Sequence, residues 1–168
     1  MSSRAKILDA IKQAQPQLLP LPEKEFGLGK TGSAQQFQIA LETIGGKAFS
    51  IQDEKEIIPY IEKLFAEAKR VVSSVTSIEK HLINDHKSIP HHSLQDVDVA
   101  IIRAQFAVAE NGAVWVTEED LKIRVLPFIC EHLVALVDKR NMVATMHDAY
   151  DKIGSADYGF GVFIAGPS

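Results

Sequence analysis

Residues Ala104 to Thr117 read Ala-Gln-Phe-Ala-Val-Ala-Glu-Asn-Gly-Ala-Val-Trp-Val-Thr, and we expect the fold to be built around this segment. Two apolar runs, Phe106–Ala109 and Ala113–Val116, flank Glu110-Asn111-Gly112. Asn-Gly favours a tight turn because both residues tolerate positive φ, so we predict two paired strands with Gly112 at positive φ. A carboxylate at the end of an apolar strand is costly to bury unless it is paired or hydrogen-bonded. Glu110 is therefore the first candidate functional residue, and the alternative is a plain hairpin with a charged residue beside its turn.

Length and composition describe an ordinary globular domain. The chain has 168 residues, of which 46% are hydrophobic and 24% charged, which indicates one domain with a sizeable core. The formal net charge of −4 disfavours nonspecific binding to nucleic acid or to anionic membranes, so no nucleic-acid partner is expected. No apolar run approaches the roughly 20 residues of a membrane span, and the N-terminus lacks an apolar signal region. We therefore expect a cytoplasmic protein without a membrane span.

Cysteine and histidine usage bears on cofactors. The single cysteine, Cys130, excludes an internal disulfide, and it cannot hold an iron–sulfur cluster alone because such clusters need about four thiolates. Four histidines lie between His81 and His92, but their spacing matches no zinc signature, and we predict a solvated loop and no metal site. No cofactor is expected to be bound by this chain alone.

The segment Gly27-Leu-Gly-Lys-Thr-Gly32 resembles a phosphate-binding loop only in part. The Walker pattern needs glycine at position 24, where this chain has Lys24, and no apolar strand precedes the segment. We therefore predict a flexible loop before a helix, with phosphate binding as the alternative.

The N-terminal residues 1–22 form a separate unit in the sequence. Ile7, Leu8 and Ile11 recur at helical spacing after a serine that can cap the helix, and three prolines between Pro16 and Pro22 make a stiff linker. This arm has too little apolar surface to fold alone, so we expect it to pack on the body or on another subunit. Residues 23–168 are then expected to form one domain.

Strands and helices alternate over that domain. Helices are predicted at 33–44, at 56–68 with a capping box at Asp53 and a kink or split at Pro59, at 76–84 and at 142–150. Further strands are predicted at 47–51, 70–74, 97–102, 132–137 and 160–165. The continuous apolar run at 132–137 predicts a strand that is covered on both faces. Residues 118–120 are expected to form an acidic loop. The pattern indicates an α/β fold with a mainly parallel sheet and helices on both faces. Ligands gather beyond the carboxyl ends of such strands, and Glu110 and Gly166 are expected to share that rim, with the Glu110 side chain partly buried.

Three segments resemble one known family. Phe106-Ala-Val-Ala-Glu-Asn-Gly-Ala-Val-Trp-Val resembles the Ala-Glu-Thr-Gly-Thr strand-turn-strand of the lactate utilization protein C family, the LUD domain. Arg124-Val-Leu-Pro127, followed by the strand at 132–137, resembles the family's Arg…Leu-Pro…His-Ile segment. Ile164-Ala-Gly-Pro-Ser168 resembles the start of its Gly-Pro-Ser-x-Thr-Ala-Asp-Ile-Glu motif. The likeness covers essentially the whole chain.

The chain also departs from the family pattern. Asn111 and Ala113 stand where the family usually has threonines. The sequence stops at Ser168, before the Thr-Ala-Asp-Ile-Glu continuation and a later Gly-x-His-Gly-Pro segment. We therefore expect the C-terminal part of the family domain to be missing from this chain.

The resemblance implies a fold similar to the NagB/RpiA/CoA-transferase-like superfamily. It also implies a role as a non-redox subunit or accessory factor of an iron–sulfur complex that oxidises L-lactate to pyruvate, with the clusters held by partner proteins. The precise task of this subunit is not implied by the resemblance. Glu110 is our catalytic candidate, and we expect a ligand, either a small carboxylate or a nucleotide-like molecule, to be bound by Asn111, Gly112, Arg124, Gly166 and Ser168.

Two other readings remain open from the sequence. Glu110-Asn-Gly112 also resembles the Ser-Glu-Asn-Gly turn of CoA-transferase β-type chains, in which the glutamate carries CoA as a thioester and nearby donors stabilise the oxyanion. Against it, Ala109 replaces the serine. The other reading is a non-catalytic scaffold, which should tolerate Glu110→Gln. The sequence leaves open whether the chain is an enzyme.

Overall fold

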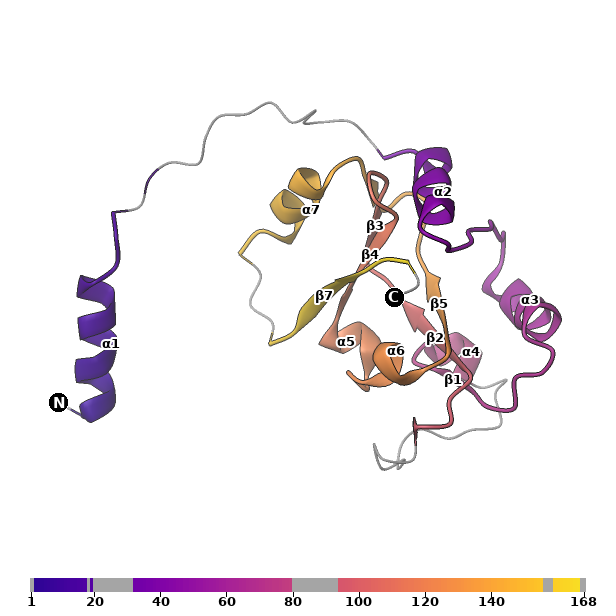
Figure 1. The fold of residues 1–168 in the computed structure, drawn as a ribbon, viewed down its shortest axis with the longest axis horizontal. Coiled ribbons are helices and arrows are strands. Elements are labelled where there is room, and N and C mark those ends of the chain that lie inside the picture. Colours follow the sequence, from indigo (N-terminus) through magenta and orange to yellow (C-terminus); the bar gives the residue numbers. More distant parts are fainter. Residues whose placement is uncertain (1, 18, 20–31, 80–93, 156–158, 167–168) are drawn as a thin grey trace.

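The fold contains two sheets with helices packed around them (Figure 1). The computed structural model describes residues 2–17, 19, 32–79, 94–155 and 159–166. The helices are α1 Ser3–Gln13, α2 Ala34–Thr43, the 3-10 helix η1 Glu54–Glu56, α3 Ile57–Leu64, α4 Thr76–Glu79, α5 Glu118–Leu121, α6 Leu126–Ile129 and α7 Met146–Ile153. The strands are β1 Val71–Ser73, β2 Val99–Arg103, β3 Phe106–Val108, β4 Ala113–Thr117, β5 His132–Leu136, β6 Met142–Val143 and β7 Gly161–Ile164.

The first sheet is parallel and the second is mixed. The order of the first is β1-β2-β5, and both pairs are parallel. The order of the second is β6-β3-β4-β7, in which β3 pairs with β6 in parallel while β4 is antiparallel to both β3 and β7. Only Ala104 and Gln105 separate β2 from β3, so the chain passes directly from the centre of one sheet into the other.

Strand β2 is buried on both faces, and this sets the layers. Val99 and Ile101 pack on one face with Ile57 and Ile61 of α3. The alternate residues Ala100 and Ile102 pack on the other face in a core shared with the second sheet. The far face of the second sheet carries Phe106 and Trp115, which pack against α7. The order of layers is therefore helix, sheet, sheet, helix, as alternating side-chain direction in strands requires.

Helix α2 closes one edge of the second sheet, where β3, β6 and β7 end. A Cβ on Gly112 would lie 3.0 Å from the Cα of Leu41, and a Cβ on Gly166 would lie 2.9 Å from Cδ1 of Ile44. A Cβ on Gly32, just before the helix, would collide with the carbonyl of Val143. The ten residues of α2 are about 15 Å long, close to the width of about 14 Å of four paired strands. Glycines at these points let the helix approach the sheet edge.

Several predictions from the sequence are confirmed. The fold is α/β with a parallel sheet and helices. Ser33 caps α2 through a bond from the Gln36 N–H, and Asp53 forms the capping box with Glu56. The helix predicted over 56–68 is split into η1 and α3, with the change of helix type before Pro59. Gly112 has φ of 71°.

Three predicted elements are wrong. Residues 47–51 form no strand, because no described strand lies beside them to pair with; Phe49 instead stacks on Tyr60 at 4.7 Å between ring centroids. The acidic loop at 118–120 is the short helix α5, started by a capping box between Thr117 and Asp120. The helix predicted over 142–150 is divided, because Met142 and its neighbour pair with β3 before Thr145 caps α7.

The apolar run at 132–137 is also placed differently from the prediction. It forms β5, which lies at an edge of the parallel sheet and is only partly buried from Leu133 onward. The strand with both faces covered is β2, whose residues from Val99 to Ile102 are fully buried. A continuous apolar run indicates burial on both faces, but strand order decides which run receives it.

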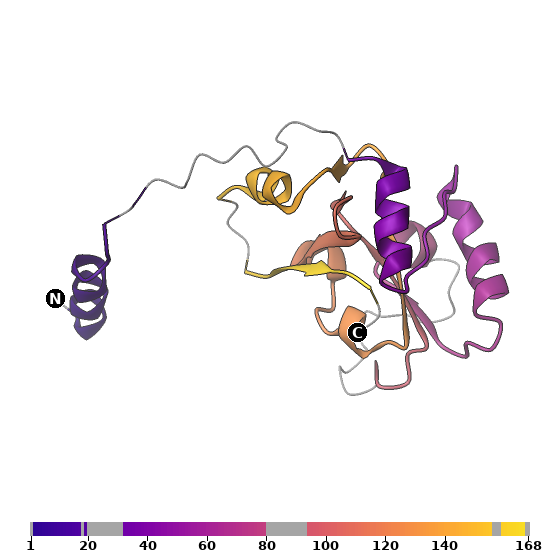
Figure 2. The same cartoon turned by 45° about the horizontal axis from the view of Figure 1, so that its top comes forward.

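The N-terminal helix α1 buries none of its residues. Ser2 caps it as predicted, and Ile7, Leu8 and Ile11 are exposed. Figures 1 and 2 show it apart from the body, and packing on another subunit, the other predicted arrangement, stays a prediction. Among the described residues, every helix is too short or too polar to cross a membrane.

We expect Gly112→Ala to lower the free energy of unfolding by more than Gly154→Ala does. Both glycines have positive φ, but a Cβ on Gly154 would meet nothing closer than the Asp151 carbonyl at 3.8 Å, whereas one on Gly112 would press on the backbone of Leu41. Positive φ alone costs about 1–2 kcal/mol for a residue with a Cβ, and the contact with α2 should add about 1 kcal/mol or more. Urea unfolding of the two variants measures the difference; equal losses would mean that α2 does not restrict this turn.

Candidate functional site

The buried polar side chains gather at the carboxyl rim of the parallel sheet. Among the described residues these are Ser73, Ser74 and Thr117. Ser73 ends β1, Ser74 follows it, and Thr117 ends β4 next to the point where the chain leaves β2. Ligands of open α/β sheets bind beyond the carboxyl ends of parallel strands, so this rim is the first place to look for a site.

Each of these hydroxyls has a partner. The Ser73 Oγ accepts from the Val75 N–H at 3.0 Å, and the Ser74 hydroxyl donates to the Asp120 carbonyl at 2.8 Å. The Asp120 carboxylate accepts from both the N–H and the hydroxyl of Thr117, each at 2.8 Å, and from the Gln105 amide at 3.0 Å. The network ties α5 to the ends of β1 and β2. A rim held in this way is a rigid support for a site.

Lys122, directly after α5, adopts a strained backbone conformation. Its φ is 55° and its ψ is −44°, and the Ile123 N–H donates to the Leu121 carbonyl at 2.5 Å, two residues back. This is a γ-turn of the rare, strained hand, in a residue with a side chain. The Lys122 ammonium donates to the Thr76 hydroxyl at 3.4 Å, at the start of α4. Strain of this kind persists where surrounding structure enforces it, often at functional sites.

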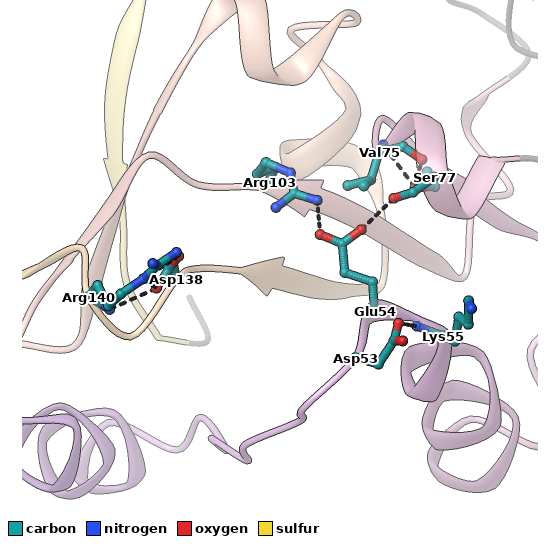
Figure 3. A network of polar contacts seen from close by, with 9 residues as sticks. Asp53, Glu54, Lys55, Val75, Ser77, Arg103, Asp138 and Arg140 are labelled. Carbon is teal, nitrogen blue, oxygen red and sulfur yellow. Dashed lines mark hydrogen bonds and ion pairs between the residues drawn. The ribbon is translucent and has the colours of Figure 1, made fainter.

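Arg103, at the carboxyl end of β2, and Glu54, in η1, form an ion pair at the same rim (Figure 3). One carboxylate oxygen of Glu54 accepts from the Arg103 guanidinium, and the other accepts from the Ser77 hydroxyl. These contacts, the Ser77 hydroxyl first, hold the pKa of Glu54 below its ordinary value. Both side chains keep solvent access, with exposed fractions of 46% for Arg103 and 40% for Glu54.

A second arginine–carboxylate pair follows the neighbouring strand β5. The Arg140 guanidinium donates to Asp138 at 2.6 Å, and its backbone N–H donates to the same carboxylate at 2.9 Å (Figure 3). The Arg140 side chain, and then its backbone N–H, lower the pKa of Asp138 to about 2. This pair is local, because its residues are two apart, whereas Arg103 and Glu54 are 49 apart.

Beneath Lys122 lies a cavity of about 10 Å³, lined mainly by apolar atoms of residues such as Val72, Leu121 and Leu126. That volume holds about one water molecule at most. This cavity is therefore too small for a metabolite, whereas Arg103 and Lys122 are exposed at the same rim.

The sequence patterns predicted a functional site at Glu110 and not at the carboxyl rim of the parallel sheet. Its carboxylate accepts from the Met146 N–H at 2.8 Å, and so caps the first turn of α7. Glu110 is exposed, which contradicts the expected partial burial. The Asn111 side chain accepts from the Ala113 N–H at 3.0 Å, and the Gly112 N–H donates to the Val108 carbonyl at 3.1 Å. The Glu110 carboxylate, the Asn111 side chain and the Gly112 N–H therefore all have structural contacts here.

The other predicted ligand-binding residues are divided between opposite edges of the second sheet. Gly112 and Gly166 lie at the edge covered by α2, as the shared-rim prediction requires. Arg124 lies near the other edge, where its guanidinium pairs with Glu118 and sits 5.6 Å from the ring centroid of Phe160. Arg124 is therefore not brought together with the Glu110 turn. Ser168 lies outside the described residues.

Metal binding has no support in the part of the chain that the structure describes. There, no three His, Cys, Asp or Glu side chains come together in a group that could hold an ion. The histidines between His81 and His92, and most of the segment from Gly27 to Gly32, lie outside the described residues.

The residues at the carboxyl rim were not singled out from the sequence, although one signal pointed to them. Ser73-Ser-Val-Thr-Ser77 is a hydroxyl-rich run directly after the apolar pair Val71-Val72. Such a run at the end of a buried parallel strand is where the rule for open α/β sheets would have placed a ligand. Arg103 and Glu54 carried no comparable signal, since their meeting depends on the packing of η1.

Comparison with known proteins identifies similar sequences and folds. The sequence model of the LUD domain matches residues 78–159. A crystal structure of a DUF162 family protein from Deinococcus radiodurans is similar in fold, with a TM-score of 0.61 and 16% sequence identity, over 78% of this chain and 85% of that chain. No curated protein matches the chain.

We expect Lys122→Gly to stabilise the domain. Glycine adopts positive φ without a steric penalty, so relief of the γ-turn should add about 1 kcal/mol to the free energy of unfolding. Lys122→Ala is the matched control, because it also removes the ammonium but keeps the strained backbone. Thermal unfolding compares the two; a Lys122→Gly variant no more stable than Lys122→Ala would mean that the turn carries no strain.

Proposed function

We propose that this chain, part of which matches the LUD domain, acts in lactate utilization as a non-redox subunit or accessory factor of an iron–sulfur complex that oxidises L-lactate to pyruvate. The observation that carries the proposal is the LUD-domain match over residues 78–159. That range contains the strand-turn-strand around Glu110 and the segment that begins at Arg124. The LUD-domain match supports the lactate-related role, and the place within an iron–sulfur complex is our proposal.

The thiol content of the chain supports a division of labour with partner proteins. Cys130 is the single cysteine, and burial raises the pKa of its thiol. Cluster ligation needs deprotonated thiolates, about four for each cluster. The electrons of lactate oxidation would therefore pass through clusters held by partner subunits.

The ligand of this subunit is, in our proposal, a small carboxylate, bound at the carboxyl rim of the parallel sheet. L-lactate and pyruvate are both monocarboxylates. The rim presents the exposed cations Arg103 and Lys122 beside the hydroxyls of Thr76 and Ser77. Arginine and hydroxyl donors recognise carboxylates by charge-assisted hydrogen bonds.

Growth on lactate tests the role in the cell. A strain of the source organism that lacks this chain should fail to grow on L-lactate as sole carbon source, should grow normally on glucose, and should recover when the chain is restored. Tagged protein purified from lactate-grown cells should bring down proteins with iron–sulfur absorbance, while the chain produced alone should be colourless. Normal growth of the deletion strain on L-lactate would refute the proposal.

The CoA-transferase reading is less well supported by the geometry of the turn. In that mechanism Glu110 attacks an acyl-CoA, and backbone donors at Asn111 and Gly112 bind the oxyanion. The Gly112 N–H instead donates to Val108, and the Glu110 carboxylate accepts from the Met146 N–H. A bonded donor must break its existing contact before it can stabilise an oxyanion.

We expect no glutamyl adduct when the purified chain is incubated with acetyl-CoA or propionyl-CoA and then reduced with borohydride. Mass spectrometry of the peptide that contains Glu110 measures the shift, and Glu110→Gln is the control that cannot form the thioester. A mass shift in the native chain alone would replace our proposal with the transferase.

The non-catalytic scaffold is better tested with Arg103→Ala than with Glu110→Gln. A glutamine at position 110 can still accept from the Met146 N–H, so Glu110→Gln should be tolerated whether or not the chain is a scaffold. Arg103 separates the readings, because its ion pair is exposed and contributes little to stability. A scaffold should support growth on L-lactate with Arg103→Ala, and a ligand-binding subunit should not.

A further inference from the structure

We propose that Arg103, Ser77 and Lys122 form a binding site for a small monocarboxylate, and that Glu54 occupies part of this site when no ligand is bound. The inference rests on the proposed function for the identity of the ligand and the rim at which it binds, and goes beyond it in naming Glu54 as the internal competitor of that ligand. None of these residues was a candidate from the sequence.

The contacts of Glu54 show how the site recognises a carboxylate. One of its oxygens accepts from the Arg103 guanidinium and the other from the Ser77 hydroxyl (Figure 3). A free carboxylate of pyruvate or L-lactate can accept the same two donors in the same arrangement. Arginine suits this task because its planar guanidinium offers several N–H groups in a fixed fork.

The position of Arg103 is set by the sheet. It ends β2, the central strand of the parallel sheet, and pairs in register with Leu136 of β5. Since side chains alternate along a strand, Arg103 points to the same face as Val99 and Ile101, toward the layer that contains α3 and α4. Its backbone belongs to a fully buried strand while its guanidinium is exposed, so the donor is held firmly and yet reachable.

Lys122 brings a second cation to the neighbouring hydroxyl. Its ammonium donates to Thr76, the residue before Ser77, and it reaches there from α5, on the opposite side of β1 and β2 from η1. The γ-turn at Lys122 lies between Leu121 and Ile123, which both pack in the core, while Lys122 itself is exposed. The strained turn thus places a cation at the hydroxyl of Thr76, next in sequence to Ser77.

Glu54 can leave the site more easily than the other members can. It lies in η1, a 3-10 helix of three residues that follows an irregular segment from Ile44 to Asp53. Its carboxylate is bound to exposed partners, and exposed ion pairs contribute only about 0.2–1 kcal/mol. A ligand carboxylate can therefore displace it, and the pair acts as a weak competitor that lowers affinity.

Titration of the purified full chain with pyruvate, and separately with L-lactate, tests the site by NMR chemical-shift changes or calorimetry. Glu54→Gln removes the competing charge and should bind pyruvate about fivefold more tightly than the native chain, the factor that corresponds to the upper end of an exposed ion pair. Arg103→Ala in the Glu54→Gln background should weaken binding at least about tenfold, because a hydrogen bond to a charged group is lost.

Asp138→Asn is the matched control for Glu54→Gln. It also removes one carboxylate that pairs with an arginine at the same rim, and it changes the net charge by the same amount. Its affinity for pyruvate should equal that of the native chain. Lactamide, the uncharged amide of lactate, should show no binding to any variant. Thermal unfolding verifies that each variant is folded. If Arg103→Ala does not fold, Arg103→Lys is used in its place.

Three results would overturn the inference: a Glu54→Gln variant that binds pyruvate no more tightly than the native chain, an equal gain in Asp138→Asn, or an unchanged affinity after loss of Arg103. These outcomes are independent of the growth experiment. If Glu54→Gln binds pyruvate tightly but the deletion strain grows normally on L-lactate, the role in lactate utilization is refuted and the binding site is supported. If the deletion strain fails to grow on L-lactate but the variants bind pyruvate no differently from the native chain, the binding site is refuted and the role in lactate utilization is supported.

Discussion

Strand β2 is the constraint on which the rest of the molecule depends. It pairs in parallel with β1 and β5, and its apolar side chains are buried on both faces, against α3 on one side and the second sheet on the other. A strand in this position can present a polar side chain only where it ends. Arg103 is that end, and the buried hydroxyls of Ser73, Ser74 and Thr117 gather at the same level because they too sit at strand ends.

The two rims of the structure serve different purposes. At the edge of the second sheet, the glycines at 32, 112 and 166 allow α2 to lie across the strand ends, and Glu110 caps α7. That edge is occupied by structural contacts. At the carboxyl rim of the parallel sheet, Arg103 and Lys122 are exposed above a fully bonded layer of hydroxyls and the Asp120 carboxylate. A rigid base with accessible cations is the arrangement that binding an anion requires.

Glu54 and Lys122 illustrate how a site can hold features that do not favour stability. The γ-turn at Lys122 lowers the stability of the fold, and the exposed ion pair between Glu54 and Arg103 contributes little to it. Both are consistent with a rim shaped for a ligand, where local strain and a displaceable partner are tolerated because the buried strands beneath supply the stability.

Features that depend on residues close along the chain could be predicted from the sequence. The caps at Ser33 and Asp53, the turn with Gly112 at positive φ and the α/β class follow from patterns only a few residues long. Tertiary structure alone decided which strands share a sheet, that β2 and not β5 is central, and that Glu110 meets α7. It also joined Arg103 to Glu54, 49 residues away, and Lys122 to Thr76, 46 residues away. The physical reason is that such contacts depend on strand order and layer packing, whose free energy is spread over the whole core and is contained in no single segment of sequence.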